Sequence, residues 1–164
     1  MRHRRIEVWI VAGMVVLDQA TKALVRARLD LSEGITVIPG VFDVTRVHNT
    51  GAAFGLLNAA DIPMKTVILG IVAAAALAGL TMYAAGLPAE HRVTRVGLAF
   101  IIGGAIGNLT DRLTTGYVVD FVDLYWAGWH FWAFNVADAA ITIGVALMIW
   151  DLLGVGRHRA PRTV

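Results

Sequence analysis

Five aspartates in or at the ends of apolar stretches are the residues whose type and position suggest chemistry. A charged side chain at membrane depth costs at least about 3 kcal/mol, so it is retained where it is paired, faces a cavity or takes part in a reaction. The function should therefore be sought at these carboxylates: Asp18, Asp111, Asp120, Asp123 and Asp138.

Other catalytic groups are scarce in the sequence. The only serine is Ser32, and there is no cysteine. A Ser-His-Asp or Cys-His arrangement is therefore disfavoured, and a zinc site would lack closely spaced His or Cys ligands. Two aspartates that share a site cannot comfortably both ionise, so one keeps a proton while the other acts as a base toward water. Such a pair needs no nucleophilic side chain, metal or cofactor.

The composition predicts a membrane protein. Of the 164 residues, 57% are hydrophobic and only 16% are charged, which is too apolar for a soluble domain of this size. Spanning a bilayer takes roughly 20 apolar residues in a helix. Four stretches qualify, so we expect one membrane domain over residues 1–164 with spans at about 6–27, 63–83, 93–113 and 134–153.

The positive charges orient these spans. Arginines precede the first span, flank the short connection between the second and third, and follow the last. The positive-inside rule places these three regions in the cytoplasm, so both termini should be inside. The net charge of +2 then reflects topology, and no nucleic-acid partner is expected. The arginines are Arg2, Arg4, Arg5, Arg92, Arg95, Arg157, Arg159 and Arg162.

Two segments should lie on the outer side. Residues 34–47 are rich in β-branched residues and interrupted by the turn signal Pro39-Gly40, which predicts short strands in a small surface sheet. The stretch 117–132 holds two tyrosines and three tryptophans, a composition typical of the membrane interface.

The predicted helix directions bring the unusual polar residues to one level. The first and third spans run outward and the fourth runs inward, so their polar ends meet near the outer surface, while the inner half of the bundle is almost entirely apolar. A polar layer concentrated at one end is hard to explain by folding alone. Its members are Asp18, Lys22, Asn108, Asp111, Arg112, Asn135 and Asp138.

Five motifs occur in an order that resembles the lipoprotein signal peptidases, also called signal peptidase II. The resemblance covers nearly the whole chain, including all four expected spans and both outer segments. The motifs are Asp18-Gln-Ala-Thr-Lys22, Asn49-Thr-Gly-Ala-Ala-Phe54, Gly103-Gly-Ala-Ile-Gly-Asn-Leu-Thr-Asp-Arg112, Val118-Val-Asp-Phe121 and Phe134-Asn-Val-Ala-Asp138.

The resemblance implies an aspartic endopeptidase with Asp120 and Asp138 as its catalytic pair, water as the nucleophile, and no metal or cofactor. Its substrates would be diacylglyceryl-modified prolipoproteins, cut before the lipidated cysteine at the outer face of the bacterial inner membrane. The implied fold is an all-α membrane protein of four transmembrane helices, with a small extracytoplasmic β-cradle and a short surface helix. We expect these two additions in the stretches 34–47 and 117–132, and a monomer surrounded by membrane lipids.

Further residues should bind substrate or support the active site. Asp18 and Lys22 stand four residues apart, so a helix-surface ion pair and direct substrate contact both remain open. Asp111 and Arg112 could neutralise a helix end, and Asp123 suits a solvated rim. The full set carried over from the motifs is Asp18, Lys22, Asn49, Gly51, Gly104, Asn108, Asp111, Arg112, Asn135 and Ala137.

Two other functions fit parts of this pattern. A small proton-coupled transporter would also bury carboxylates, but usually near the bilayer midplane and within repeated halves. A membrane scaffold would need no aspartate pair. The concentration of acids in one outer layer favours the peptidase.

Overall fold

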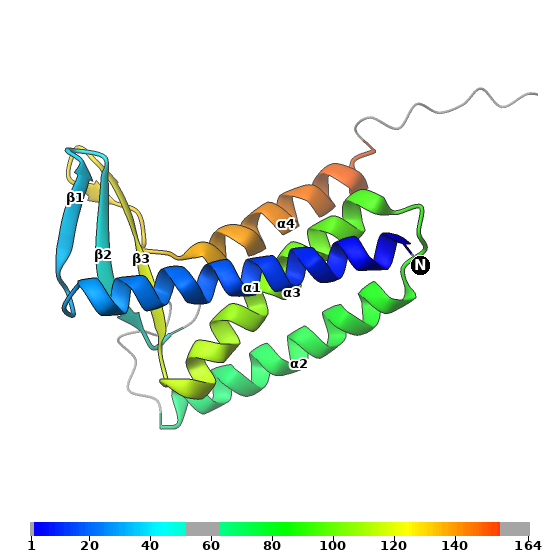
Figure 1. Ribbon diagram of the computed structural model, residues 1–164, viewed down its shortest axis with the longest axis horizontal. Helices are drawn as coiled ribbons and strands as arrows, with labels where there is room; N and C mark the ends of the chain where they lie inside the picture. Colours follow the sequence, from blue (N-terminus) through cyan, green and yellow to red (C-terminus); the bar gives the residue numbers. More distant parts are fainter. Residues whose placement is uncertain (1, 52–62, 155–164) are drawn as a thin grey trace, which may run out of the picture.

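The computed structural model describes residues 2–51 and 63–154, and in this part of the chain four helices meet a small sheet at one end (Figure 1). Residues 52–54 of the Asn49–Phe54 motif lie outside the described residues. So does the C-terminal stretch 155–164, which holds Arg157, Arg159 and Arg162. The elements are α1 (Arg2–Arg28), β1 (Gly34–Ile38), β2 (Phe42–Asn49), α2 (Lys65–Gly86), α3 (Arg92–Thr114), β3 (Val118–Trp126), β4 (Trp129–His130) and α4 (Val136–Leu152).

Among the described residues, three helices are long and apolar enough to cross a membrane: α1, α2 and α3. The sequence predicted a fourth span at 134–153, and α4 has 17 residues, or about 26 Å at 1.5 Å per residue, which is at the lower limit of the roughly 17–25 residues of a membrane-spanning helix. The helix starts late because Asn135 has an extended backbone and caps it. Asn135 therefore lies just outside the helix, and its side chain accepts a hydrogen bond from the first turn.

The helix α3 is the centre of the bundle, since it packs against α1, α2 and α4. Glycines let it approach its neighbours closely: a Cβ on Gly97 would come within 2.7 Å of the Gly144 carbonyl oxygen in α4, and one on Gly103 within 2.8 Å of Met14 Cβ in α1. Small residues commonly allow such contacts between membrane helices. The bundle is therefore built by backbone proximity more than by large interlocking side chains.

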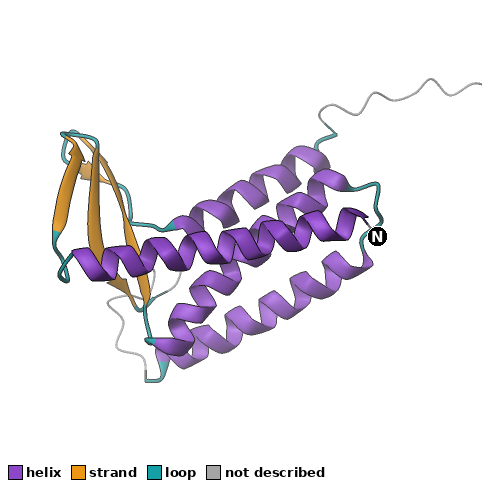
Figure 2. Cartoon of the chain, in the orientation of Figure 1, coloured by secondary structure: helices purple, strands orange, loops and turns teal. Residues whose placement is uncertain are grey.

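The strands form one antiparallel sheet in the order β1-β2-β3-β4, at the end of the bundle where α1 ends and α4 begins (Figure 2). The strands predicted at 34–47 are confirmed as β1 and β2. The fold is not purely all-α, however, because the second outer segment adds two further strands to this sheet.

The expectation of a short surface helix in the stretch 117–132 is wrong. Its β-branched and aromatic residues pair as β3 and β4, and Trp126 lies opposite Trp129. The two residues between them, Ala127 and Gly128, have φ of 50° and 82°, and positive φ at both positions is the geometry of a type I′ hairpin turn. Among the described residues, no other helix takes the place of the expected one.

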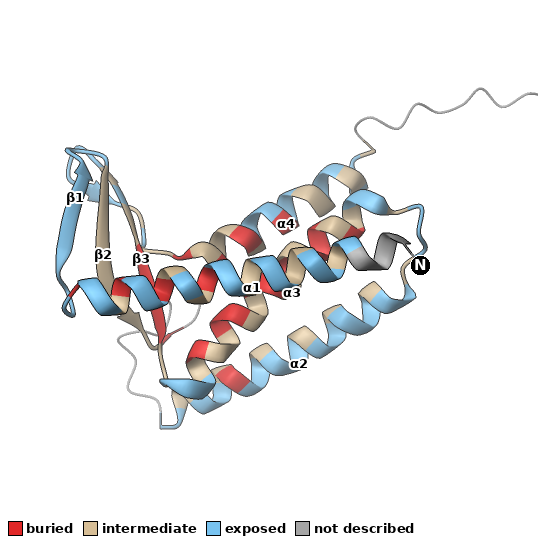
Figure 3. Ribbon diagram, in the orientation of Figure 1, coloured by how far each residue is buried: buried red, intermediate tan, exposed pale blue. Residues whose placement is uncertain are grey.

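The sheet is fixed to the bundle by a small apolar core at the outer end of α1. Val25 and Leu29 of α1 pack with Val119 and Phe121 of β3. Figure 3 shows the buried residues gathered where α1, α3, α4 and β3 meet, whereas most of α2 is exposed. The rigid part of the molecule is thus the region that must hold the polar layer.

Candidate active site

The first turn of α4 positions Asp138. Asn135 Oδ1 accepts a hydrogen bond from the backbone amide of Asp138 at 3.0 Å, and the backbone amide of Asn135 donates to Asp138 Oδ2 at 3.2 Å. The two bonds together make a capping box. The partial positive charge at a helix N-terminus favours a carboxylate there. Asp138 Oδ1 accepts a further bond of 2.8 Å from Asn108 Nδ2 of α3. Both oxygens of Asp138 are therefore held in place.

Strand β3 positions Asp120 beside it. The residue is 3% exposed, and its two oxygens accept bonds from Asn135 Nδ2 at 2.7 Å and Asn49 Nδ2 at 2.9 Å. Burial, together with the negative charge of Asp138, raises the pKa of Asp120 to about 7, although the two amide donors oppose this change. A carboxyl group in this position can hold a proton near neutral pH.

Asn135 connects the two carboxylates. Its side-chain nitrogen donates to Asp120, while its oxygen and backbone amide bond Asp138. The residue is fully buried, and its nitrogen also lies 3.2 Å from Asn108 Oδ1. One asparagine thus ties the strand aspartate to the helix aspartate.

A buried ionic cluster lies behind this pair. Lys22 Nζ is 2.8 Å from Asp18 Oδ2 and 3.0 Å from Asp111 Oδ2, and Arg26 is 2.7 Å from Asp111 Oδ1. Asp18 and Lys22 form the ion pair that their spacing suggested, but the pair is fully buried and not on the helix surface. Asp111 also neutralises cations, but they come from α1 rather than from its neighbour Arg112.

Arg112 instead extends away from this cluster, toward the chain that follows β2. Its Nη2 donates to the Gly51 carbonyl at 3.0 Å, and the Gly51 amide donates to Asn49 Oδ1 at 2.9 Å. Arg112 interacts electrostatically with both Asp120 and Asp138. It therefore orders the end of β2 while placing a positive charge near the pair.

Backbone spacing explains the small residues of the motifs. A Cβ on Gly104 would clash with the Ala137 carbonyl oxygen, and one on Gly107 with the Asp18 carboxylate. The Ala137 amide in turn donates to Asp18 Oδ1 at 3.0 Å. These contacts fix the start of α4 against α1 and α3.

The structure also shows a residue of the layer that the sequence analysis missed. Gln19 Nε2 donates to Asp18 Oδ2 at 3.1 Å and to the Gly107 carbonyl at 3.1 Å, whereas Arg26 binds Asp111 from the partly exposed edge of the cluster. The sequence did contain a signal for Arg26, which follows Lys22 by four residues and so shares its helix face, whereas Gln19 directly follows Asp18 and has no such spacing. Asp123, expected at a rim, pairs with exposed His130 at 3.0 Å.

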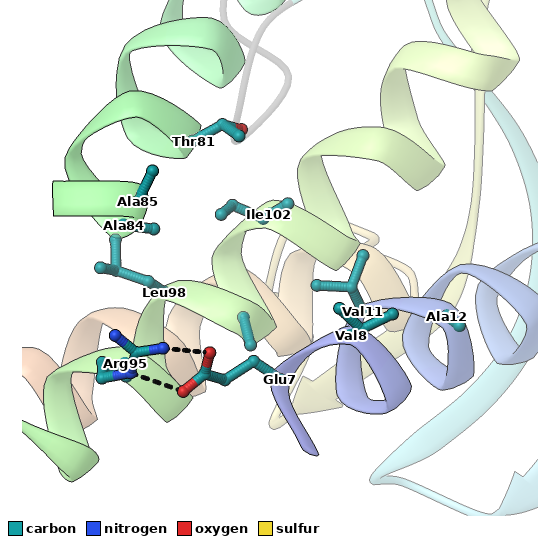
Figure 4. Close-up of a pocket in the computed structure, with 11 residues that line it drawn as sticks. Glu7, Val8, Val11, Ala12, Thr81, Ala84, Ala85, Arg95, Leu98 and Ile102 are labelled. Atoms are coloured by element: carbon teal, nitrogen blue, oxygen red, sulfur yellow. Dashed lines mark hydrogen bonds and ion pairs between the residues drawn. The ribbon is translucent and has the colours of Figure 1, made fainter. Parts of the chain in front are cut away.

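Within residues 2–51 and 63–154, no three His, Cys, Asp or Glu side chains gather in a way that could hold a metal ion. A cavity of about 400 Å³ lies between α1, α2 and α3 at the opposite end of the bundle (Figure 4). There Arg95 binds both oxygens of Glu7 at 2.6 Å. Because this ion pair is satisfied and the remaining lining is almost wholly apolar, the cavity offers no alternative reaction centre.

Several known proteins are similar to this chain over most of its length. Residues 10–154 match the family model described as signal peptidase (SPase) II. A lipoprotein signal peptidase of Geobacter sulfurreducens is 42% identical over 93% of this chain and 94% of its own length. One from Pseudomonas aeruginosa is 39% identical over 88% and 85%, respectively.

Two solved structures have the same fold, and both are described as bacterial membrane enzymes determined by the in meso method. The one at 2.3 Å resolution is 30% identical, with a TM-score of 0.83 over 97% of this chain and 94% of the other. The one at 1.9 Å resolution is 28% identical, with a TM-score of 0.79 over 90% and 92%.

Proposed function

The chain belongs to the signal peptidase II family, and from that premise we propose that Asp120 and Asp138 are its catalytic pair. It is a multi-pass bacterial membrane protein with lipoprotein signal peptidase activity, removing signal peptides from prolipoproteins. The observation that carries the proposal is Asn135, which is hydrogen-bonded to both aspartates at once. The transporter considered from the sequence is set aside.

The pair acts with one proton between its two members. The ionised aspartate takes a proton from a water molecule as the oxygen of that water attacks the scissile carbonyl carbon. The protonated aspartate donates to the carbonyl oxygen, which becomes a hydroxyl of the tetrahedral intermediate. When the intermediate collapses, the carbon–nitrogen bond breaks, and the aspartate that took the proton from water gives it to the leaving amine. One hydroxyl of the intermediate returns its proton to the other aspartate as the carbonyl re-forms, so the pair again holds one proton. The raised pKa of Asp120 supports the presence of a proton near neutral pH.

The substrate is a diacylglyceryl-modified prolipoprotein, cut before its lipidated cysteine at the outer face of the inner membrane. Two features support this assignment. Strand β3 and the start of α4, which carry the pair, lie at the end of the bundle where the sheet is (Figure 1). In the same outer segment Trp126, Trp129 and Trp132 are exposed, as is common for tryptophans at a membrane interface. We further propose that α4 is a fourth span, that both termini are cytoplasmic, and that a monomer suffices because one chain supplies the whole pair.

The test is cleavage of a diacylated prolipoprotein by purified Asp120→Asn and Asp138→Asn variants. Each should lose about 10²–10⁴-fold in kcat, the usual contribution of a general acid or base, because neither member can act alone. Asp123→Asn is the matched control, since Asp123 lies on the same strand but pairs with His130. Turnover near the parental value in either pair variant would remove that aspartate from the mechanism.

A further inference from the structure

The ammonium group of Lys22 has three acceptors for its three protons. Besides Asp18 Oδ2 and Asp111 Oδ2, its Nζ donates to Asn108 Oδ1 at 2.9 Å. Lys22 is fully buried and so is held at one geometry. The two carboxylates occupy two donors and leave the third directed at the Asn108 amide.

This third bond fixes which way the Asn108 amide faces. Its oxygen accepts from Lys22 and lies 3.2 Å from Asn135 Nδ2, while its nitrogen donates to Asp138 Oδ1 at 2.8 Å. Turning the amide over would set its NH₂ group against two donors and its oxygen against a carboxylate. All three neighbours therefore favour the same orientation, and the only full positive charge among them is that of Lys22.

We propose that Lys22 is a positioning residue for the reaction, acting through Asn108 to hold Asp138 and Asn135 in their working arrangement. The inference rests on the catalytic pair proposed above and deepens it. Lys22 makes no hydrogen bond to Asp138, although its charge acts on both aspartates at longer range; its hydrogen bond sets the Asn108 amide, and the amide sets the carboxylate.

Arg26 provides the contrast within the same cluster. It is also a cation of α1, and it also pairs with Asp111, at 2.7 Å. Its side chain is 25% exposed, and it binds the oxygen of Asp111 that Lys22 leaves free. Losing Arg26 therefore removes one positive charge from the cluster without disturbing the Asn108 amide.

The test compares Lys22→Met with Arg26→Gln in the full-length protein, using a diacylated prolipoprotein at fixed detergent and salt. Lys22→Met should lower kcat by about 10²-fold, the effect of a misplacement of about 1 Å in a catalytic group. KM should stay unchanged because Lys22 is buried away from substrate. Arg26→Gln should keep the parental kcat.

The pH–rate profile separates positioning from a purely structural role. The charged groups around the pair are Lys22 and Asp18 from α1 and Arg112 from α3. Loss of the Lys22 charge should move the profile of the folded variant to higher pH, and Arg26→Gln should leave it in place. A Lys22→Met protein with fewer folded molecules but parental kcat per folded molecule and an unmoved profile would overturn the inference.

A second variant is needed because Lys22→Met could misfold. Without Lys22, the carboxylates of Asp18 and Asp111 face a single cation, Arg26. When Lys22→Met is combined with Asp18→Asn, the buried charges balance again, and the new side-chain carbonyl at position 18 can still accept from the Ala137 amide. We expect kcat to remain low, because Asn108 still lacks its partner. Recovery of parental kcat would show that Lys22 only balances charge.

Asp138→Asn, assayed in parallel, distinguishes the failure of this inference from the failure of the proposed function. If Asp138→Asn stays active, the catalytic pair itself fails. If Asp138→Asn is inactive while both Lys22 variants keep the parental kcat, only the role of Lys22 fails.

Discussion

At the scale of single residues, the two aspartates differ in what surrounds them. Asp138 lies at a helix start and receives a backbone amide, whereas Asp120 lies within a strand and receives only side-chain amides from Asn49 and Asn135. The two neutral amides stabilise the ionised form of buried Asp120 only weakly. The ionised form of Asp138 is stabilised more, by the helix N-terminus and by the Asn108 amide, which Lys22 holds in place. This difference favours Asp120 as the member that keeps the proton in the resting enzyme.

The identity of the polar residues could be predicted from the sequence, but their partners across helices could not. A charge at membrane depth is conspicuous by itself, and the Asp18–Lys22 spacing indicates their contact directly. The pairing of Asp111 with Arg26 depends on how α1 and α3 are rotated toward each other. The sequence suggested that Asp111 and Arg112 together neutralise a helix end, whereas the ion pairs of Asp111 are with Lys22 and Arg26.

At the scale of elements, the contact between α3 and α4 places Asp138. Gly104→Ala should weaken it, because the added carbon would lie 2.9 Å from Ile141 Cγ1 and closer still to the Ala137 carbonyl oxygen, which cannot rotate away. We expect a stability loss of about 1–3 kcal/mol, typical of overpacking, together with a lower kcat because the first turn of α4 must move. Thermal unfolding in detergent and cleavage assays measure the two effects.

Gly79→Ala is the control for that prediction. Gly79 lies in α2, and a Cβ there would meet nothing within 4 Å. Its unfolding midpoint should not fall, since alanine is the better helix former by roughly 1 kcal/mol. If Gly104→Ala behaves like Gly79→Ala, the close packing of α3 on α4 does not position the site.

The elements themselves were predictable to different degrees. Long apolar runs predicted all four helices correctly, three of which are long enough to span a membrane, and the β-branched stretch around Pro39-Gly40 predicted β1 and β2. The hairpin of β3 and β4 was missed because its aromatic residues also suit a membrane interface, and its turn, Ala127-Gly128, lacks the usual asparagine or aspartate signal. The late start of α4 follows from the capping role of Asn135, which apolarity alone does not reveal.

At the scale of the whole molecule, the charge distribution and the position of the sheet predict the same orientation. A reporter active only in the periplasm should be silent when fused at Val164 and active when inserted near Glu33 or Gly116, because the arginine-rich regions remain inside. A periplasmic signal at Val164 would mean that α4 does not cross the membrane. Equal signals at all three sites would contradict the proposed topology as a whole.

The Arg95–Glu7 ion pair and the polar layer that holds the proposed catalytic aspartates lie far apart along the bundle. Asn108 lies 13 positions after Arg95 in α3, about 20 Å along the helix, so the Arg95–Glu7 pair and the catalytic layer occupy opposite ends of the bundle. The sequence predicted this polarity from composition, since its inner halves are apolar and its outer ends polar. The hydrogen-bond connections within the layer required the structure.

The measurement that tests the central claim most directly is the initial rate of prolipoprotein cleavage against pH, at fixed detergent and salt. A pair sharing one proton is inactive when both aspartates are protonated and when both are ionised, so the profile should be bell-shaped. Because the pKa of Asp120 is raised to about 7, the shared proton is retained below that pH, and the rate should fall as the pH rises through it. A rate that climbs steadily into alkaline pH would indicate a lysine or hydroxyl base and would contradict the two-aspartate mechanism.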